Sequence, residues 1–486
     1  MGSAEPNTTG CGFMPRRVRG LETEYGLQVE VQQAPTAELA GWRRLGADEA
    51  ARQLFRPVTT VNATTNVFLR NGGRMYLDVG SHPEYATAEC DRIDDLVAHD
   101  RAGDAVMNRL ADRALAMMAA EGVVGRVRLF KNNLDSHGNS YGSHENYQVR
   151  RDTTLRAFSA ALTPFLVVRQ LLCGAGTFVR SGEAAGEFWL SQRAAHMWDP
   201  LSSTTTRSRP MINTRDEPHA DPQVHRRLHV IVGDSNLAQP TLALRVAATE
   251  LMVRAVEEGH HFASLALADP GQAIRDTARD LTGRVSLDLA DGGTASPLAL
   301  LEDCLAVAER YTADEAWLVR AVDDWRRVIT AVADGRLDLI HHDIDWAIKL
   351  RLLTRDRQRR GGAPDPARSA QLDLAFHDIR PGQGLFGRLE EAGQVATRVE
   401  AGVIDAAVDR PPSTTRAHLR GALISAAQRH ERSHTVDWMS FNCRDLDQGN
   451  VICPDPLAAE DPRVERLIDR MASEPRAGRS STFTIS

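Results

Sequence analysis

Lysine is nearly absent from this sequence of 486 residues, because only Lys131 and Lys349 are lysines among its 58 lysine and arginine residues. The shortage excludes two widespread phosphate-binding motifs. A Walker loop needs Gly-Lys-Ser/Thr, and a protein kinase needs a strand lysine in a Val-Ala-Ile-Lys context. Lys131 follows Phe130, and Lys349 ends the helical-looking run Asp-Trp-Ala-Ile-Lys. The sequence therefore predicts neither a P-loop NTPase nor a protein kinase.

Three further absences narrow the class of protein. The six cysteines form no Cys-x-x-Cys pair, so neither a zinc site nor a disulfide framework is predicted. No apolar run is long enough to span a bilayer and no signal peptide is recognisable, which predicts a cytoplasmic location and no membrane partner. A net charge of −7 argues against nucleic acid as a partner, since phosphate binding needs a basic surface.

The stretch of residues 74–90 carries the strongest chemical signal. Its first half alternates, and since successive side chains of a strand point to opposite faces, Arg74, Tyr76 and Asp78 share one face. The other face is apolar, and Glu84 follows beyond a Gly-Ser-His-Pro turn. An exposed strand with a charged face would explain any one of these residues. The combination of guanidinium, phenol and carboxylates in register indicates a functional site.

A second pair of carboxylates lies upstream, in residues 20–26. Glu22 and Glu24 are two residues apart and so share a strand face. Two strands that offer carboxylates to one space repel each other unless a cation lies between them. The oxygen-rich ligands indicate Mg²⁺, which usually binds together with phosphates because it keeps waters and takes few protein carboxylates.

Residues 135–145 allow two interpretations. Residues 138–142 match the Gly-x-Ser-x-Gly pattern of serine hydrolases, which requires a strand, a sharp turn at the serine and then a helix. The segment after Gly142 reads as a strand, so a hydrolase nucleophile is not expected. His144 and Glu145 are either neighbours of a metal or phosphate, or ordinary structural residues.

Arginine and hydroxyl side chains are concentrated in residues 204–221. Arginine presents a planar fork of donors that suits phosphate and carboxylate groups. Arg207, Arg209 and Arg215 are therefore candidates for such contacts, unless they belong to a polar loop tied down by its own acidic residues. The next segment, residues 227–234, reads as a buried strand with Arg227 and His229 on one face.

These segments resemble the successive signatures of the Pup ligase family (proteasome accessory factor A). The matching segments are residues 20–26, 71–90, 130–147, 205–221, 226–236, 371–384 and 435–438. The resemblance extends from Met14 to about Met471. Ser143 stands where the family usually has cysteine, and the N-terminal extension is unmatched.

The resemblance implies an α+β fold related to glutamine synthetase and the carboxylate-amine ligases. Its large domain would have a curved antiparallel sheet packed by helices, and a small α+β domain would follow at the C-terminus. The implied activity is that of an ATP-dependent Pup–protein ligase. It would phosphorylate the side-chain carboxylate of the C-terminal glutamate of Pup, a prokaryotic ubiquitin-like protein. It would then join that glutamate to a lysine of a target protein in an isopeptide bond, tagging the target for proteasomal degradation.

By the same resemblance, Glu22, Tyr76 and Glu84 would bind Mg²⁺. His144 and His229 are further candidate metal ligands. Asp78 would be the proton acceptor, kept ionised by the guanidinium of Arg74 on the same strand face.

Arg74, Thr87 and Trp438 would contact ATP, and Arg207, Arg209 and Arg227 are candidates for phosphate or glutamate contacts. A regular strand would put Glu84 and Thr87 on opposite faces, so an irregular stretch after Pro83 is expected.

Three alternatives remain. The related Pup deamidase typically has a longer insertion after the first glutamate strand and reads His-Ala-His-Pro-Glu, where this chain has Val79-Gly-Ser-His-Pro-Glu84. A non-catalytic Pup-binding adaptor would not need the carboxylates. A small-molecule glutamate-amine ligase would share the chemistry.

The lysine shortage also has two explanations. A GC-rich genome would account for it, since alanine and arginine are abundant throughout. Alternatively, an enzyme that modifies lysine gains from having few of its own.

At this length we expect one large and one smaller domain. Residues 1–13 read as a disordered extension, residues 14–410 as the catalytic domain and residues 411–486 as the small domain, with Arg-Pro-Pro-Ser-Thr at the boundary. Helices are expected at residues 93–121, 242–258, 297–311, 314–334 and 341–355. Loop and strand are expected at residues 371–385.

Overall fold

The computed structural model describes residues 12–32, 41–62, 64–135, 137–180, 182, 184–204 and 209–475. These residues form two compact units. Unit 1 takes its residues from the N-terminus to Arg17 and from Lys131–Asp216 and Val224–Arg398. Unit 2 takes its residues from Val18–Phe130, Glu217–Gln223 and the chain after Arg398. The predicted boundary at residue 410 stays a prediction from composition, whereas compactness divides the chain elsewhere.

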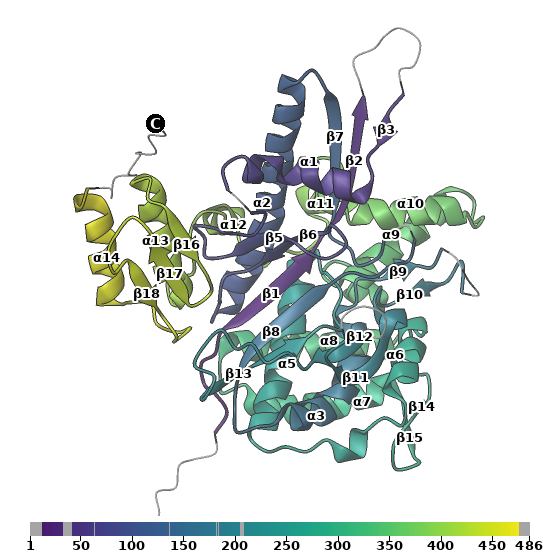
Figure 1. Ribbon diagram of the computed structural model, residues 1–486. Helices are drawn as coiled ribbons and strands as arrows, with labels where there is room; N and C mark the ends of the chain where they lie inside the picture. The colour runs from purple at the N-terminus through teal and green to yellow at the C-terminus, as the bar shows by residue number, and fades with distance from the viewer. Residues whose placement is uncertain are drawn as a thin grey trace, which may run out of the picture. The chain divides into compact units, whose positions relative to one another are not determined.

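The N-terminal part of unit 2 contains two sets of antiparallel strands. β1 (Arg19–Glu24) pairs with β6 (Pro83–Ala86), β6 with β5 (Arg74–Leu77), and β5 with β4 (Val67–Phe68). β2 (Gly26–Gln32) pairs with β3 (Arg43–Arg44) and β7 (Val124–Phe130). Helices α1 (Ala47–Thr59) and α2 (Ile93–Ala120) pack against each other and against β2 and β7, respectively (Figure 1).

The C-terminal part of unit 2 has its own small core. Strands β16 (His434–Val436), β17 (Ser440–Cys443) and β18 (Asn450–Ile452) form an antiparallel sheet. Helices α13 (Arg416–Arg429) and α14 (Pro462–Ser473) pack against each other, and α12 (Ala401–Ala407) packs on α2. Buried residues such as Leu423, Phe441 and Met471 fill this core.

Two glycines let α13 approach the turn before β5. A Cβ atom on Gly421 would lie 2.3 Å from the carbonyl oxygen of Arg70, and one on Gly72 would lie 2.8 Å from the Cβ of Ala417. Gly72 also has a φ of +80°, which L-residues with side chains rarely adopt. The first turn of α13 therefore lies directly on the chain that enters β5.

Unit 1 contains a four-stranded arrangement in the order β11-β12-β13-β8. β11 (Met197–Ser202) runs parallel to β12 (Arg209–Asn213), whereas β12, β13 (His225–Val230) and β8 (Ser143–Arg150) are antiparallel. Two short hairpins, β9 (Thr177–Phe178) with β10 (Phe188–Trp189) and β14 (Leu287–Asp288) with β15 (Thr294–Ala295), complete the described strands of this unit.

Helices supply most of the core of unit 1. The buried helix α5 (Gln239–Glu257) packs against α3 (Leu155–Val168), α7 (Pro297–Ala308), α8 (Ala316–Ala333) and β8 (Figure 1). The remaining described helices of this unit are α4 (Gln170–Cys173), α6 (Pro270–Arg279), α9 (Asp345–Arg359), α10 (Pro366–Phe376), α11 (Leu385–Glu391) and four 3₁₀ turns (Ala194–His196, Ala263–Leu265, Glu309–Tyr311, Leu337–Leu339). The helices α6, α7 and α10 begin with Asp-Pro or Ser-Pro. The aspartate or serine side chain caps the helix, and proline occupies its first turn.

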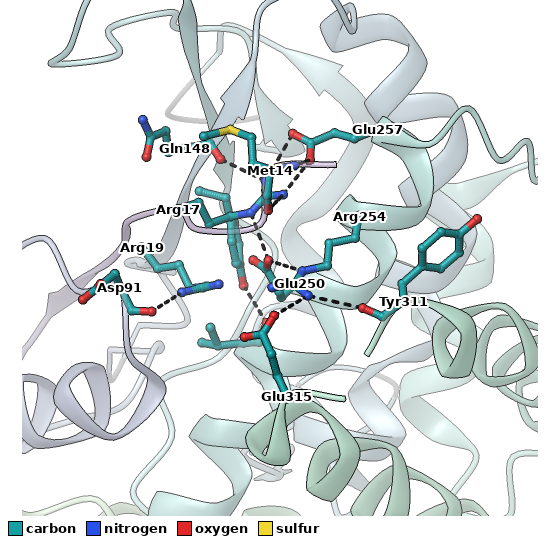
Figure 2. A network of polar contacts seen from close by, with 12 residues as sticks. Met14, Arg17, Arg19, Asp91, Gln148, Glu250, Arg254, Glu257, Tyr311 and Glu315 are labelled. Atoms are coloured by element: carbon teal, nitrogen blue, oxygen red, sulfur yellow. Dashed lines mark hydrogen bonds and ion pairs between the residues drawn. The ribbon is translucent and has the colours of Figure 1, made fainter. Parts of the chain in front are cut away.

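A buried network of charges ties the N-terminal segment to α5 (Figure 2). The guanidinium of Arg17 lies 2.9 Å from Glu250 and 2.6 Å from Glu257, and all three side chains are fully buried. Glu250 also pairs with Arg254 at 2.8 Å, and Arg254 pairs with Glu315 at 2.7 Å. Burial lowers the pKa of Arg17, but Glu250 and Glu257 outweigh it and raise the pKa above its ordinary value.

The five helices predicted from the sequence are all confirmed, since α2, α5, α7, α8 and α9 lie close to the expected ranges. The expectation of loop and strand over residues 371–385 is wrong in its first part, where α10 runs to Phe376. Asp365 caps α10 by accepting a hydrogen bond from the backbone N–H of Arg368, and this start signal lies upstream of residues 371–385. Within the described residues, no helix is both long and apolar enough to cross a membrane.

Candidate active site

Three strands of unit 2 place acidic and phenolic side chains in register. Tyr76 on β5 lies opposite Glu84 on β6, and Glu84 lies opposite Glu24 on β1. One step along the strands, Arg74 lies opposite Ala86, which lies opposite Glu22. Directly opposite residues in antiparallel strands share a face. The predicted alignment of these side chains is thus present, and cross-strand register produces it.

The charges of this site repel one another. The hydroxyl of Tyr76 donates to Oε1 of Glu84 at 2.5 Å. Burial, followed by the charges of Glu22 and Glu24, raises the pKa of the Glu84 carboxyl well above its ordinary value. Burial, followed by Glu22 and Glu84, likewise raises the pKa of the Tyr76 phenol. A divalent cation would remove this repulsion.

The carboxylates of Glu24, Asp78 and Glu84 each offer an oxygen within 4.8 Å of the other two. Together with the Tyr76 hydroxyl these are hard oxygen donors, the ligands that Mg²⁺ prefers. The residues present therefore fit the predicted ion. Glu24 has no role in the sequence-based ligand set, although its two-residue spacing from Glu22 was the available signal.

A tight turn holds Asp78 at the end of β5. The backbone N–H of Asp78 donates to the carbonyl of His82 at 2.9 Å, and Gly80 and Ser81 both have positive φ angles, of 88° and 65°. A serine in this left-handed region is uncommon and carries strain, which occurs most often at functional sites.

Arg74 begins β5, whereas Asp78 lies just beyond its last residue, Leu77. Four residues of extended chain span about 13 Å. The Arg74 guanidinium instead lies 4.4 Å from the centre of the Tyr76 ring, and its Nε donates to Asn66 at 2.6 Å. A direct influence of Arg74 on Asp78, expected from their shared strand face, stays a prediction.

Thr87 is the first residue after β6, and it extends the hydrogen bonding between β6 and β1 by one residue. The Thr87 hydroxyl accepts a hydrogen bond from the N–H of Leu21 at 3.0 Å, and its N–H donates to the Leu21 carbonyl. Pairing is regular from Glu84 to Ala86, so the irregular stretch expected after Pro83 is not found there.

Trp438, in the connection between β16 and β17, belongs to an aromatic and cationic cluster. Its ring meets Phe68 edge-on at 5.0 Å and lies 5.9 Å from the ring of His219. The guanidinium of Arg420 lies 4.9 Å from the Trp438 ring centre. Phe68, His219 and Arg420 come from distant segments that no local sequence pattern links to Trp438.

The candidate residues of unit 1 lie on β8, β12 and β13. The rings of His144 and His229 are 5.1 Å apart, and the guanidinium of Arg227 donates to Asn146 at 3.3 Å. Arg209 donates to the carbonyl of Ser140 at 2.6 Å. Their roles as metal ligands or phosphate contacts stay predictions, and Arg207 lies outside the described residues.

The structure decides the role of Glu145 and the interpretation of the Gly-x-Ser-x-Gly pattern, whereas the role of His144 stays a prediction. Glu145 forms a buried ion pair with Arg169 at 2.6 Å, and its carboxylate also accepts from the Tyr147 hydroxyl at 2.8 Å. Burial raises the pKa of Glu145, but Arg169 and Arg245 outweigh it and lower the pKa. Glu145 is thus a structural residue. Strand β8 begins at Ser143, so no helix follows Gly142 and the hydrolase pattern has no structural support.

Arginines from outside residues 204–221 contact Asp216, an acidic residue of this segment. Asp216 pairs with Arg151 at 2.7 Å and lies 3.8 Å from Arg226. Arg215 donates its backbone N–H to Asn213 at 2.8 Å.

Solved structures define the class of this protein. With a TM-score of 0.87 and 41% identity, the chain matches the crystal structure of a complex between Pup and its ligase PafA, covering 95% of this chain and 92% of that one. With a TM-score of 0.81 and 41% identity, it matches PafA in complex with ADP, covering 91% and 97%. Both matches are to ligases, and the predicted α+β ligase fold is confirmed.

Sequence relatives identify the family within that class. The family described as "Pup-ligase protein" matches residues 17–442. The Pup–protein ligase of Actinosynnema mirum is 48% identical over 458 residues, covering 94% of this chain and 99% of that protein. The Pup–protein ligase of Jonesia denitrificans is 46% identical over 469 residues, covering 95% and 100%. The chain belongs to the Pup ligase family, which confirms the ligase over the deamidase prediction.

Proposed function

We propose that this ligase uses Mg²⁺ and ATP to activate the C-terminal glutamate of Pup and joins it to a lysine of a target protein. The row of Glu24, Glu84 and Tyr76, with Asp78 beside it, carries this proposal. Buried carboxylates that repel one another cost stability unless they serve a cation. The solved structures of PafA with ADP and of PafA with Pup support the choice of nucleotide and partner, respectively.

The reaction proceeds through an acyl phosphate. A side-chain carboxylate oxygen of the Pup glutamate attacks the γ-phosphorus of ATP, and ADP leaves. The amine of the target lysine then attacks the acyl carbon, inorganic phosphate leaves, and the isopeptide bond remains. The first step makes a poor electrophile reactive, and the second needs a neutral amine.

Glu22, Tyr76 and Glu84 are the proposed Mg²⁺ ligands, and Glu24 joins them as the residue opposite Glu84. When bound, the ion supplies positive charge to the phosphate oxygens. Asp78 is the proposed proton acceptor for the lysine ammonium, because it is the carboxylate at the end of the strand and outside the paired row. His144 and His229 stay candidate ligands.

Arg74, Thr87 and Trp438 are the proposed ATP contacts. The stacking of Arg74 on Tyr76 keeps its guanidinium beside the acidic row, where phosphates would need a cation. Arg209 and Arg227, with Arg207, stay proposed contacts for phosphate or for the Pup glutamate. The cytoplasmic location likewise remains a prediction.

The test is a gel-shift assay with two reactions. The first contains the protein, Mg²⁺-ATP, Pup ending in glutamate and a lysine-bearing acceptor, and the second contains a preformed conjugate and Pup ending in glutamine. We expect a new ATP-dependent isopeptide band in the first reaction. Cleavage or deamidation in the second, with no product in the first, would show that the proposed reaction is wrong.

A further inference from the structure

Glu89, three residues beyond β6, is held by two arginines of α13. Arg416 donates to its Oε1 at 2.7 Å from Nη2 and at 3.2 Å from Nε. Arg420 donates to the same oxygen at 3.0 Å and contacts the second oxygen as well. Burial raises the pKa of Glu89, but the two guanidinium groups outweigh burial and lower it to about 2. This ion cluster is therefore charged at neutral pH.

Arg420 connects the ion cluster to Trp438. Its Nη1 donates to the Trp438 carbonyl at 2.9 Å, and its Nη2 donates to the Gly72 carbonyl at 2.6 Å. The same guanidinium lies against the Trp438 ring at 4.9 Å and the Phe68 ring at 5.5 Å. One side chain thus bonds to the backbone of Trp438, contacts its ring, and reaches the turn before Arg74.

Trp438 needs such support because of where it lies. It occupies the short connection between β16 and β17, where the N–H of Asp437 donates to Ser440 at 2.8 Å. A connection at the end of a three-stranded sheet does not by itself fix the orientation of a half-buried indole ring. Phe68, which meets the ring edge-on, and Arg420, which lies over the ring, supply that orientation.

We infer that Arg420, held by Glu89, is a positioning residue that sets the Trp438 ring for stacking on the base of ATP. Both terminal nitrogens of Arg420 already donate to protein acceptors, so Arg420 acts through Trp438. The inference rests on the proposed function, which assigns Trp438 to ATP. A purely structural ion cluster is the competing explanation, and it predicts a general loss of activity.

The test separates the KM for ATP from the KM for Pup and from kcat. We expect Arg420→Gln to raise the KM for ATP about tenfold. The substitution would leave the Trp438 ring less well oriented and so weaken its stacking on the base of ATP. At saturating ATP, the KM for Pup and kcat should match wild type. Trp438→Ala should show the same loss, and the double variant should lose no more than either single variant.

Arg463→Gln is the matched control. Arg463 lies in the same C-terminal segment and pairs with Asp461 at 2.6 Å, but its side chain is 55% exposed. Its kinetic constants should equal those of wild type. If Arg420→Gln does not fold, Glu89→Gln is measured instead, since it keeps the shape and removes the charge that holds Arg420.

The outcomes separate two failures. If Trp438→Ala leaves the KM for ATP unchanged, the proposed contact of Trp438 with ATP is wrong. If Trp438→Ala raises this KM and neither Arg420→Gln nor Glu89→Gln does, the positioning role alone is wrong. An equal fall of kcat and of both affinities in the Arg420 or Glu89 variant supports the structural explanation and overturns the inference.

Discussion

Asp78 differs from its acidic neighbours in the way that the chain holds it. Glu24 and Glu84 belong to paired strands and are buried, whereas Asp78 follows the last residue of β5 and leads into a turn with two left-handed residues. Residues in paired strands suit fixed ligands. A carboxylate at a strand end suits proton transfer, because it can reach an incoming group without disturbing the ladder.

Asp78→Asn tests this division of roles. The amide keeps the size of the side chain but cannot accept a proton from an ammonium, so we expect conjugation to fall at least a hundredfold. Binding of Mg²⁺-ATP, measured by calorimetry, should stay close to wild type. Conjugation at a near wild-type rate would show that another group accepts the proton.

Glu84→Ala tests the metal ligands. It removes the central member of the row and the acceptor of the Tyr76 hydroxyl, so we expect Mg²⁺-ATP binding itself to weaken by about tenfold or more, which calorimetry measures directly. Glu22→Ala should behave similarly. Glu30→Ala on β2, outside this row, is the control and should bind Mg²⁺-ATP normally. Unchanged binding in Glu84→Ala would contradict the ligand assignment.

At the scale of elements, the buried ion pairs of Arg17 hold the N-terminal segment on α5. Its guanidinium serves both Glu250 and Glu257, and Glu250 has Arg254 as a second partner. Removing one partner of a buried ion pair leaves the other charge buried and uncompensated. The free-energy cost of that buried charge exceeds the net stabilisation that the intact pair provides.

Arg17→Met should therefore lower the free energy of unfolding by about 3–5 kcal/mol. Denaturant unfolding followed by circular dichroism measures this change. The control is Arg43→Met, because Arg43 pairs with Glu49 across an exposed surface and should give no measurable change. Equal stability of Arg17→Met and wild type would mean that the network of Figure 2 does not hold this segment.

At the scale of the whole molecule, both lysines are buried. Lys131 and Lys349 are each 1% exposed. The ammonium of Lys349 lies 2.7 Å from Asp373, donates to the Gly176 carbonyl at 2.6 Å, and lies 2.6 Å from Nε2 of His377. Burial, followed by Lys349, lowers the pKa of His377 well below its ordinary value, so His377 is a neutral acceptor. The surface therefore offers no lysine amine.

We expect the wild-type ligase to form no conjugate with its own lysines in the presence of Pup and ATP. Variants that carry exposed lysines, Arg320→Lys and Arg463→Lys, should become modified, because these side chains are 61% and 55% exposed. Intact-mass and peptide spectrometry detect the modification. A wild-type conjugate at Lys131 or Lys349 would contradict this expectation, and unmodified variants would leave genome composition as the explanation.

Local patterns predicted the parts of the site that lie within one strand. The alternation of residues 74–79 and the spacing of Glu22 and Glu24 set which side chains share a face, because that depends only on the strand period. Periodicity also located the long helices, since an apolar stripe repeats within each one. The family signatures extended this to Thr87 and Trp438.

The sequence by itself determined the family, five of the long helices and which side chains share a face along each strand. Tertiary structure decided which strands pair, and so placed Glu24 beside Glu84 and Tyr76. It also joined Glu89 to Arg420 across 331 residues and turned Glu145 toward Arg169. The physical reason is that a strand or helix period is a local property. Register and ion-pair partners follow from long-range packing, which no single segment encodes.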